Sequence, residues 1–258
     1  MIGFIGVGNM ASSILIGALK QNFLTENDVM IYDINQEQIN KITNRYHVNI
    51  AQDVEMLVNK CNIIMLGIKT YQIDDFFKQY QICFKNKTLI SIALGYDFEK
   101  YNEILDLSTR HIFVMPNTPC LVGEGMSLIE EKHNLTSTEF QFVEGLFQSV
   151  GKTEVLPSHL MNIGGCISGC SPAYIYMLIE AMADIGVTHG LNRDMAYKLA
   201  SQTIKGAGTM QLETDLHPAI LKDQVCSPLG STILGVNELE KQKFRYAIMA
   251  AIDKAYHH

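Results

Sequence analysis

Three hydroxyl side chains lie close together in the stretch from Lys222 to Glu240, which reads K-D-Q-V-C-S-P-L-G-S-T-I-L-G-V-N-E-L-E. They belong to Ser227, Ser231 and Thr232. Pro228 and Gly230 predict the end of one helix, and the hydroxyls of Ser231 and Thr232 are predicted to cap the next. Backbone N–H groups at a helix start attract carboxylate or phosphate. The stretch therefore predicts a small-anion site, and its alternative is an ordinary capped helix-turn-helix corner.

A second candidate site lies near the start of the chain, where residues 2 to 20 read I-G-F-I-G-V-G-N-M-A-S-S-I-L-I-G-A-L-K. The pattern predicts a strand, a glycine turn and a helix, with Gly6, Gly8 and Ala11 at the positions of a G-x-G-x-x-G/A motif. A further apolar run, V-M-I-Y-D, ends in Asp33, where a ribose-binding carboxylate belongs. These features predict a dinucleotide site, and the alternative is any doubly wound domain with a glycine turn.

The elements that position these residues alternate between strand and helix. Strands are predicted at 62–67, 89–93 and 110–115, with helices at 35–46 and 73–80. This alternation predicts a parallel sheet with helices on both faces, in which ligands bind outside the strand C-termini. The loops 67–70, 93–95 and 115–119 are therefore expected beside Gly6 and Gly8. Within them, Pro116 and Pro119 are expected to leave Asn117 and Thr118 free for hydrogen bonds, while Lys69 is either a ligand-binding or a solvated lysine.

The predicted secondary structure changes after Gly151, and the last residues with a strand pattern are 154–156. We therefore predict two domains, 1–155 and 156–258, the second built from helices at about 158–189, 193–213, 217–226 and 232–256. Residues 160–179 carry no charge, which allows a membrane span as an alternative. Asn162, Ser168 and Ser171 make the segment poorly apolar, so a buried helix covered by a second subunit is the better prediction.

Composition excludes several classes of protein. The chain has 258 residues, 47% hydrophobic and 18% charged, with a net charge of −7 and no basic cluster, which argues against a nucleic-acid partner. No basic segment precedes the first apolar run, so a cytoplasmic location without a membrane anchor is expected. The six cysteines form no C-x-x-C pair, and Cys166 and Cys170 lack companion ligands, so reduced thiols without a metal are expected.

The chain resembles the pyrroline-5-carboxylate reductases over nearly its whole length. The matching segments are F-I-G-V-G-N-M-A at the start, M-P-N-T-P at 115–119, S-P-A-Y at 171–174, I-E-A-M-A-D-I-G-V at 179–187 and L-K-D-Q-V-C-S-P-L-G-S-T-I at 221–233. The resemblance implies an N-terminal Rossmann-type domain and an all-helical dimerisation domain. It further implies reduction of 1-pyrroline-5-carboxylate to L-proline, the last step of proline biosynthesis, by hydride from NADPH or NADH. Substrate would bind at a homodimer interface, and dimers would assemble into decamers.

The resemblance also assigns roles to individual residues. The cofactor would be held by Gly6, Val7, Gly8, Asn9, Met10, Ala11, Asp33, Lys69, Ala93, Gly95 and Asn117. The substrate would be bound by Ser227, Gly230, Ser231 and Thr232, with the catalytic Thr232 hydroxyl near the ring nitrogen. Asp33 suits a free ribose 2′-OH, and no arginine stands at 34–38, so the hypothesis is dual use with NADH at least competitive with NADPH.

The sequence departs from the family pattern at several positions. Thr70 stands where the family usually has proline, C-S stands at 170–171 where it has S-G, and Leu229 stands where it has glycine. Leucine at 229 brings a side chain and a backbone restriction to the edge of the predicted substrate site. Two other functions follow as alternatives: a divergent paralogue that binds cofactor and acts in regulation, and a β-hydroxyacid dehydrogenase. The second alternative expects a catalytic lysine within residues 161–179, which contain none.

Overall fold

The computed structural model describes residues 1–257, and its first unit is organised around an eight-stranded sheet. The strands are β1 (Ile2–Ile5), β2 (Val29–Tyr32), β3 (Asn49–Ile50), β4 (Ile63–Leu66), β5 (Thr88–Ser91), β6 (Arg110–Met115), β7 (Gly125–Glu130) and β8 (Gly151–Leu156). Their order is β3-β2-β1-β4-β5-β6-β7-β8. The first six strands run parallel, as predicted, whereas β7 runs antiparallel to β6. The short 3₁₀ segment η4 (Thr118–Val122) returns the chain to β7 without the crossover helix that a parallel neighbour needs.

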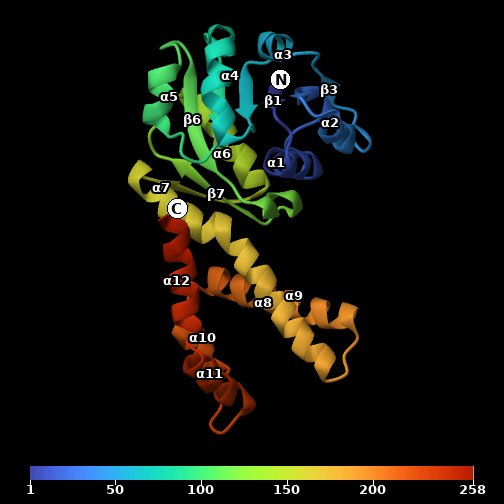
Figure 1. Ribbon diagram of the computed structural model, residues 1–258, viewed down its shortest axis with the longest axis vertical. Helices are drawn as coiled ribbons and strands as arrows, with labels where there is room; N and C mark the ends of the chain where they lie inside the picture. The colour runs from blue at the N-terminus through green and yellow to red at the C-terminus, as the bar shows by residue number, and fades with distance from the viewer. Residues whose placement is uncertain (258) are drawn as a thin grey trace. The chain divides into compact units, whose positions relative to one another are not determined.

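Helices cover both faces of this sheet (Figure 1). They are α1 (Asn9–Lys20), α2 (Gln36–Thr43), α3 (Val54–Lys60), α4 (Ile73–Tyr80), α5 (Phe98–Ile104), α6 (Ser137–Ser149) and α7 (Ser158–Gly165), with 3₁₀ segments η1 (Glu26–Asp28), η2 (Thr70–Gln72) and η3 (Gln81–Phe84). One buried cluster joins α1, α2 and α6 to one face, and a second joins α3, α4 and α5 to the other. Neighbouring residues of a strand alternate between them: Met65 packs in the first, Ile64 and Leu66 in the second.

Polar groups of this unit find partners inside it. Asn35, Asp53, Asp97 and Thr136 each cap a helix by accepting a backbone N–H from its first turn. Glu139 also accepts from the Arg110 guanidinium at 2.8 Å and from the Thr88 hydroxyl. Burial alone would raise the pKa of Glu139, but hydrogen bonds from Thr88, Thr136 and Arg110 outweigh burial and lower it to about 2.

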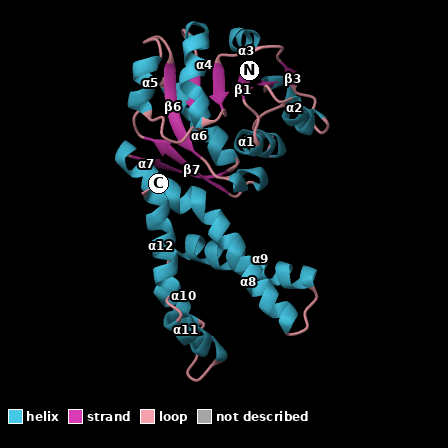
Figure 2. Ribbon diagram, in the orientation of Figure 1, coloured by secondary structure: helices cyan, strands magenta, loops and turns pink. Residues whose placement is uncertain are grey.

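The second unit begins at Cys170 and is drawn in Figure 2 as helices and connecting loops. Its helices are α8 (Ser171–Thr188), α9 (Arg193–Thr214), α10 (Pro218–Gln224), α11 (Ser231–Lys241) and α12 (Phe244–Tyr256). A π-helical turn, Cys166–Cys170, joins α7 to α8, so that one helix runs through Ser158–Thr188. The two compact units therefore divide inside this helix, at Gly169 and Cys170, whereas the boundary predicted near residue 155 lies at the end of β8.

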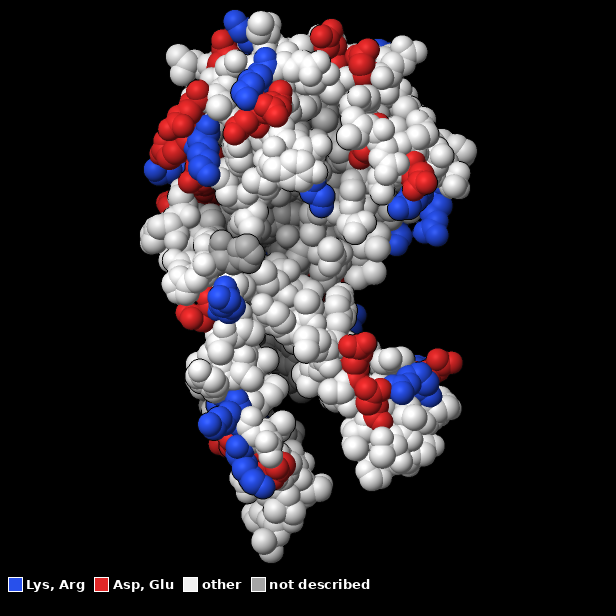
Figure 3. All heavy atoms as spheres, in the orientation of Figure 1, with Lys and Arg blue, Asp and Glu red and all other residues white. Residues whose placement is uncertain are grey.

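The second unit has a small interior. Among its described residues, those buried are Ala183, Ala196 and Ala200, where α8 packs on α9. Large apolar side chains stay exposed along its helices, and Figure 3 shows broad uncharged areas on them. By length and composition the helix Ser158–Thr188 is apolar enough to cross a membrane, and only 11% of its most apolar stretch is buried within the chain. Exposed apolar surface of this extent marks an interaction surface.

Candidate functional site

The glycine turn after β1 forms the floor of the first candidate site. Gly6 has a φ of +82°, and a Cβ placed on it would lie 2.8 Å from the carbonyl carbon of Gly67. The Gly6 N–H donates to the Tyr32 carbonyl at 2.8 Å, which fixes the turn against β2. Any side chain at Gly6 would therefore meet both strain and a clash. The turn connects β1 directly to α1, which begins at Asn9.

The N-terminus of α1 is open toward the pocket. Gly8 precedes the helix in an extended conformation, no side chain caps it, and the first turn contains no acidic residue. A Cβ added at Gly8 would have no neighbour within 4 Å. Open space beside uncapped N–H groups, at the positive end of a helix dipole, fits a phosphate. These features are those that a dinucleotide pyrophosphate requires.

Asp33 holds two loops in place at the end of β2. One carboxylate oxygen accepts the Val7 N–H at 2.7 Å, and the other accepts the Asn35 N–H at 2.8 Å. A carboxylate has about four acceptor sites, so both oxygens can still accept a hydroxyl. Asp33 is half-buried and lines the pocket, as a ribose-binding residue must.

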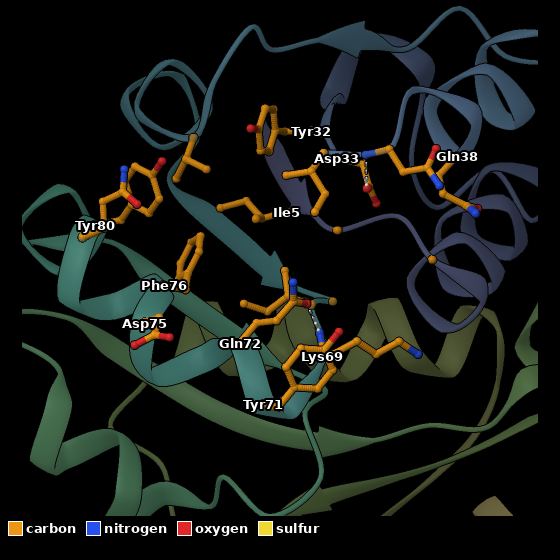
Figure 4. A pocket seen from close by; sticks show the side chains of 18 residues that line it. Ile5, Tyr32, Asp33, Gln38, Lys69, Tyr71, Gln72, Asp75, Phe76 and Tyr80 are labelled. Carbon is orange, nitrogen blue, oxygen red and sulfur yellow. Dashed lines mark hydrogen bonds between the residues drawn. The ribbon is translucent and has the colours of Figure 1, made fainter.

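These groups meet in a pocket of about 680 Å³ within the first unit (Figure 4). Of the residues predicted to bind cofactor, Gly6, Gly8, Asp33 and Lys69 line it. Sequence reasoning missed several side chains of the wall, among them Tyr32, Ile34, Gln38, Tyr71, Phe76 and Tyr80. In Figure 4, Gln38 lies beside Asp33, whereas Lys69 and Tyr71 lie together at another edge. The missed residues lie at or just after the end of β2, in η2, or on α2 and α4. Their positions near strand ends of an open α/β sheet were the available signal.

The pocket is more acidic than basic. Asp33 and Asp75 line it, and Lys69 is the one cation among the lining residues that the structure describes. Burial raises the pKa of Tyr32, and the negative charges of Asp53 and Asp33 raise it further. A second negative group, such as a ribose 2′-phosphate, would meet repulsion at Asp33.

The remaining predicted residues of the motif belong to its frame. Val7 and Ala11 are buried, Met10 is half-buried, and the Asn9 carbonyl accepts the hydroxyls of Ser12 and Ser13. They shape the turn and the start of α1 without lining the pocket.

Ala93 and Gly95 lie in the loop between β5 and α5, which is bonded to the edge of the pocket. The Thr70 hydroxyl donates to the Leu94 carbonyl at 3.1 Å, and the Tyr96 hydroxyl donates to Asp74 at 2.5 Å. The bond to Asp74 raises the pKa of Tyr96 to about 12. Thr70, which replaces the family's proline, therefore joins this loop to the Lys69 loop.

Asn117, predicted to be free for hydrogen bonds, makes them with other groups of the first unit. Its side-chain oxygen accepts the Met126 N–H at 2.9 Å, and its NH₂ group donates to the Ser168 carbonyl at 2.9 Å. The side chain is buried and holds the loop after β6 against β7 and the π-helical turn. Its buried amide has found partners within the first unit, as buried polar groups generally must.

In the second unit, Ser227 to Gly230 form a tight turn before α11. The Gly230 N–H donates to the Ser227 carbonyl at 3.0 Å. The prediction that Ser231 and Thr232 cap the helix is wrong, because α11 begins at Ser231 and its cap is Gly230, which is extended at φ −71° and ψ 160°. No side chain caps α11, and its first turn has no acidic residue. The exposed Ser227, Ser231 and Thr232 thus flank an open helix N-terminus.

Among residues 1–257, no group of three His, Cys, Asp or Glu side chains is placed to hold a metal ion. All six cysteines are free thiols. The two open helix termini that follow an extended glycine, one in each unit, suit small anionic ligands.

Comparison with known proteins gives matches along the whole chain. Residues 1–95 match a family model described as NADP oxidoreductase, coenzyme F420-dependent, and residues 158–258 match one described as pyrroline-5-carboxylate reductase dimerisation. The chain is 35% identical to a pyrroline-5-carboxylate reductase of Treponema pallidum, with 98% of both chains covered. It is 37% identical to one of Arabidopsis thaliana, covering 97% of this chain and 91% of that protein. A crystal structure of Plasmodium falciparum pyrroline carboxylate reductase with NADP bound superposes with a TM-score of 0.89, at 33% identity, covering 99% of this chain and 95% of that one.

Proposed function

The chain belongs to the pyrroline-5-carboxylate reductase family, and we propose that it reduces 1-pyrroline-5-carboxylate to L-proline with a hydride from a reduced nicotinamide dinucleotide. The observation that carries the proposal is the pocket of the first unit. There the close packing at Gly6, the open space at Gly8 and the carboxylate of Asp33 combine the requirements of a dinucleotide.

The residues present fit the cofactor. The α1 N-terminus would hold the pyrophosphate, Asp33 a ribose hydroxyl, and the loops containing Lys69 and Ala93 to Gly95 the nicotinamide half. When bound, the cofactor supplies the hydride. The chain's contribution is to orient the reacting groups and to stabilise charge at the imine.

The turn before α11 would bind the substrate. The uncapped N–H groups after Gly230, with the hydroxyls of Ser227 and Ser231, suit its carboxylate. An imine accepts hydride readily only when its nitrogen is protonated or hydrogen-bonded. We assign the Thr232 hydroxyl, exposed in the first turn of α11, to that nitrogen, where a hydrogen bond helps more in the transition state than in the ground state.

NADH should serve at least as well as NADPH. Asp33 is held by two backbone N–H groups, so its carboxylate cannot swing away from a 2′-phosphate without losing both bonds. The described lining offers no arginine, and its one lysine, Lys69, lies at another edge of the pocket (Figure 4). The relative crystallised with NADP shows that a member of the family accepts the phosphorylated cofactor. The preference of this chain is therefore a property of its Asp33 loop.

The second unit would be completed by a second copy of the chain. Its exposed apolar helices exceed what a soluble monomer tolerates, and the matching family model is described as a dimerisation region. Asn162, Ser168 and Ser171 lie within the long apolar helix and favour burial against protein over lipid. We expect an obligate dimer in the cytoplasm. Assembly of dimers into a decamer stays a prediction, which sedimentation of the purified protein decides.

One spectrophotometric assay tests the function. Purified protein is mixed with 1-pyrroline-5-carboxylate and either NADH or NADPH, and the loss of reduced nicotinamide is followed together with the formation of proline. We expect turnover with both cofactors and a kcat/KM for NADH no lower than that for NADPH. A protein that binds the cofactors but oxidises neither in the presence of the imine would instead fit the regulatory paralogue.

A further inference from the structure

Leu229 has an unusual backbone conformation. It is the third residue of the turn Ser227 to Gly230, with Pro228 second and a φ of +63° at Leu229 itself. This is the type II arrangement, whose third position normally holds glycine because φ is positive there. Among residues 1–257 the other non-glycine residues with positive φ are Asn22, Asn86, Asp215 and Lys243, all polar. Among the described residues, Leu229 is thus the one aliphatic residue with φ in this strained region.

The side chain of Leu229 gains nothing from the rest of the chain. It is 96% exposed, so neither packing nor burial offsets the backbone strain. Leu107 in the first unit is 97% exposed but has no positive φ. A single exposed leucine is ordinary. An exposed leucine in a strained conformation, where glycine would relieve the strain, indicates a contact with something outside the chain.

The turn lies at the helix start to which the proposed function assigns the substrate carboxylate. Leu229 directly precedes Gly230, the uncapped N-cap of α11. A Cβ placed on Gly230 would lie 2.5 Å from the Ser227 hydroxyl, so the turn is closely folded around the proposed carboxylate site. A cyclic imine whose carboxylate binds at this helix start carries its apolar ring carbons beside the turn. The isobutyl group of Leu229 is the most exposed apolar side chain near the turn, at 96%, against 64% for both Val225 and Leu234.

We propose that Leu229 is a specificity residue, which packs against the ring methylenes of the substrate and disfavours polar ring substituents. This inference rests on the proposed function and narrows its substrate class to cyclic imine carboxylates with unsubstituted ring carbons. A hydrophobic contact of this size discriminates by about 10-fold or more, because a ring hydroxyl placed against it loses its water without gaining a partner.

The test compares Leu229→Ala, Leu229→Gly and the control Leu107→Ala. Alanine removes the isobutyl group and keeps the positive φ, whereas glycine also relieves the strain. For each variant, kcat/KM is measured with 1-pyrroline-5-carboxylate and with its 3-hydroxy analogue. We expect both Leu229 variants to lower the preference for the unsubstituted ring by about 10-fold. We expect Leu229→Gly to melt at a temperature equal to or above that of the parent, and Leu107→Ala to leave the preference unchanged.

A binding measurement without cofactor separates this inference from the proposed function. Calorimetry compares cyclopentanecarboxylate with acetate, which share the carboxylate and differ in the ring. We expect the parent to prefer the ring by about 10-fold and Leu229→Ala to lose that preference, even if the protein proves not to be a reductase. Unchanged ring preference in Leu229→Ala would overturn the inference. Dissociation of the dimer in that variant would also overturn it, by assigning the side chain to the partner subunit.

Discussion

The two units of this chain differ in how much of their apolar surface they bury within the chain. In the first, apolar side chains fill two clusters on the faces of a sheet, and charged groups such as Glu139 are paired inside the unit. In the second, three alanines make up the described buried set, while the large apolar side chains stay exposed. The first unit buries its apolar side chains within itself, and the exposed apolar surface of the second unit supports the proposal that a second copy of the chain covers it.

The units share one feature in spite of this difference. Each has a helix that begins at an extended glycine, without a side-chain cap and without an acidic residue in its first turn: α1 at Gly8 and α11 at Gly230. Asn35, Asp53 and Thr136 cap other helices, and the uncapped helices α7 and α12 follow Pro157 and Lys243 rather than an extended glycine. Open helix N-termini bind anions, so the pair predicts one anionic ligand for each unit.

The largest effect is expected from a charge on the exposed apolar surface of the second unit. Met177 lies on α8 and is 67% exposed in the single chain. If a second copy covers it, Met177→Glu buries an unpaired charge, at about 4 kcal/mol per copy, and weakens the dimer by about 10³-fold for each. Sedimentation equilibrium measures the dissociation. The matched control is Leu107→Glu in the first unit. A Met177→Glu protein that remains a stable dimer would contradict the proposal that a second copy covers this surface.

The next effect concerns the proposed proton donor of the second unit. Thr232→Val keeps the shape of the side chain and removes its hydroxyl, so kcat should fall by about 10²-fold while KM changes less. Because Gly230 and not Thr232 caps α11, the melting temperature should stay unchanged. Thr232→Ser should recover most of the rate. Thr203→Val, which removes a hydroxyl bonded within α9, serves as the control. A Thr232→Val rate within about threefold of the parent would assign no catalytic role to the hydroxyl.

The first unit should lose stability in acid through Glu139. Its pKa of about 2 lies below the ordinary value of 4.5, so the ionised form stabilises the folded state. This contribution is fully present above about pH 4.5 and is lost as the pH falls toward 2. Discounted for partial exposure, it amounts to about 2 kcal/mol. Denaturant titrations of the parent and of Glu139→Gln should differ by this amount at pH 7 and converge in acid; a constant gap at all pH values would contradict the assignment.

The smallest effect is expected at Asp33, where the change is in preference rather than in rate. Asp33→Asn removes the charge but keeps an oxygen for one of its two backbone bonds. Relative to NADH, kcat/KM for NADPH should rise by about 10-fold, or about 1.4 kcal/mol. Asp75→Asn changes another acidic residue of the same pocket and is the control. If both substitutions shift the ratio equally, general charge rather than Asp33 sets the preference.

Local signals explain how much of the fold could be predicted. The glycine turn, the apolar strands and the long uncharged helix each show their pattern within a few residues, and the structure has them at β1–α1, β4, β5 and Ser158–Thr188. The reversal of β7 carries no such signal, because its direction depends on how η4 returns the chain to the sheet. Strand direction is thus a tertiary property that the residues of β7 alone do not encode.

In the candidate site, the residues of the local motif were predictable, whereas those placed by tertiary contacts were not. Gly6, Gly8 and Asp33 follow a spaced motif, and the structure brings them to one pocket. The roles of Tyr71, Gln38 and the hydrogen-bonded amide of Asn117 depend on neighbours far away in sequence, such as Ser168 for Asn117. The caps of α11 failed for a different reason: hydroxyls at 231 and 232 suggest capping, but the extended backbone that a cap requires falls on Gly230.

Transfer of a labelled hydride tests the central claim most directly. The protein is supplied with NADH deuterated at nicotinamide C4, using each stereoisomer in turn, and with unlabelled 1-pyrroline-5-carboxylate, and the product is examined by mass spectrometry and NMR. The account predicts L-proline that carries deuterium at ring carbon 5, formed in equal amount to the cofactor oxidised, from one of the two stereoisomers. Unlabelled proline from both stereoisomers, or cofactor left unoxidised beside the imine, would contradict it.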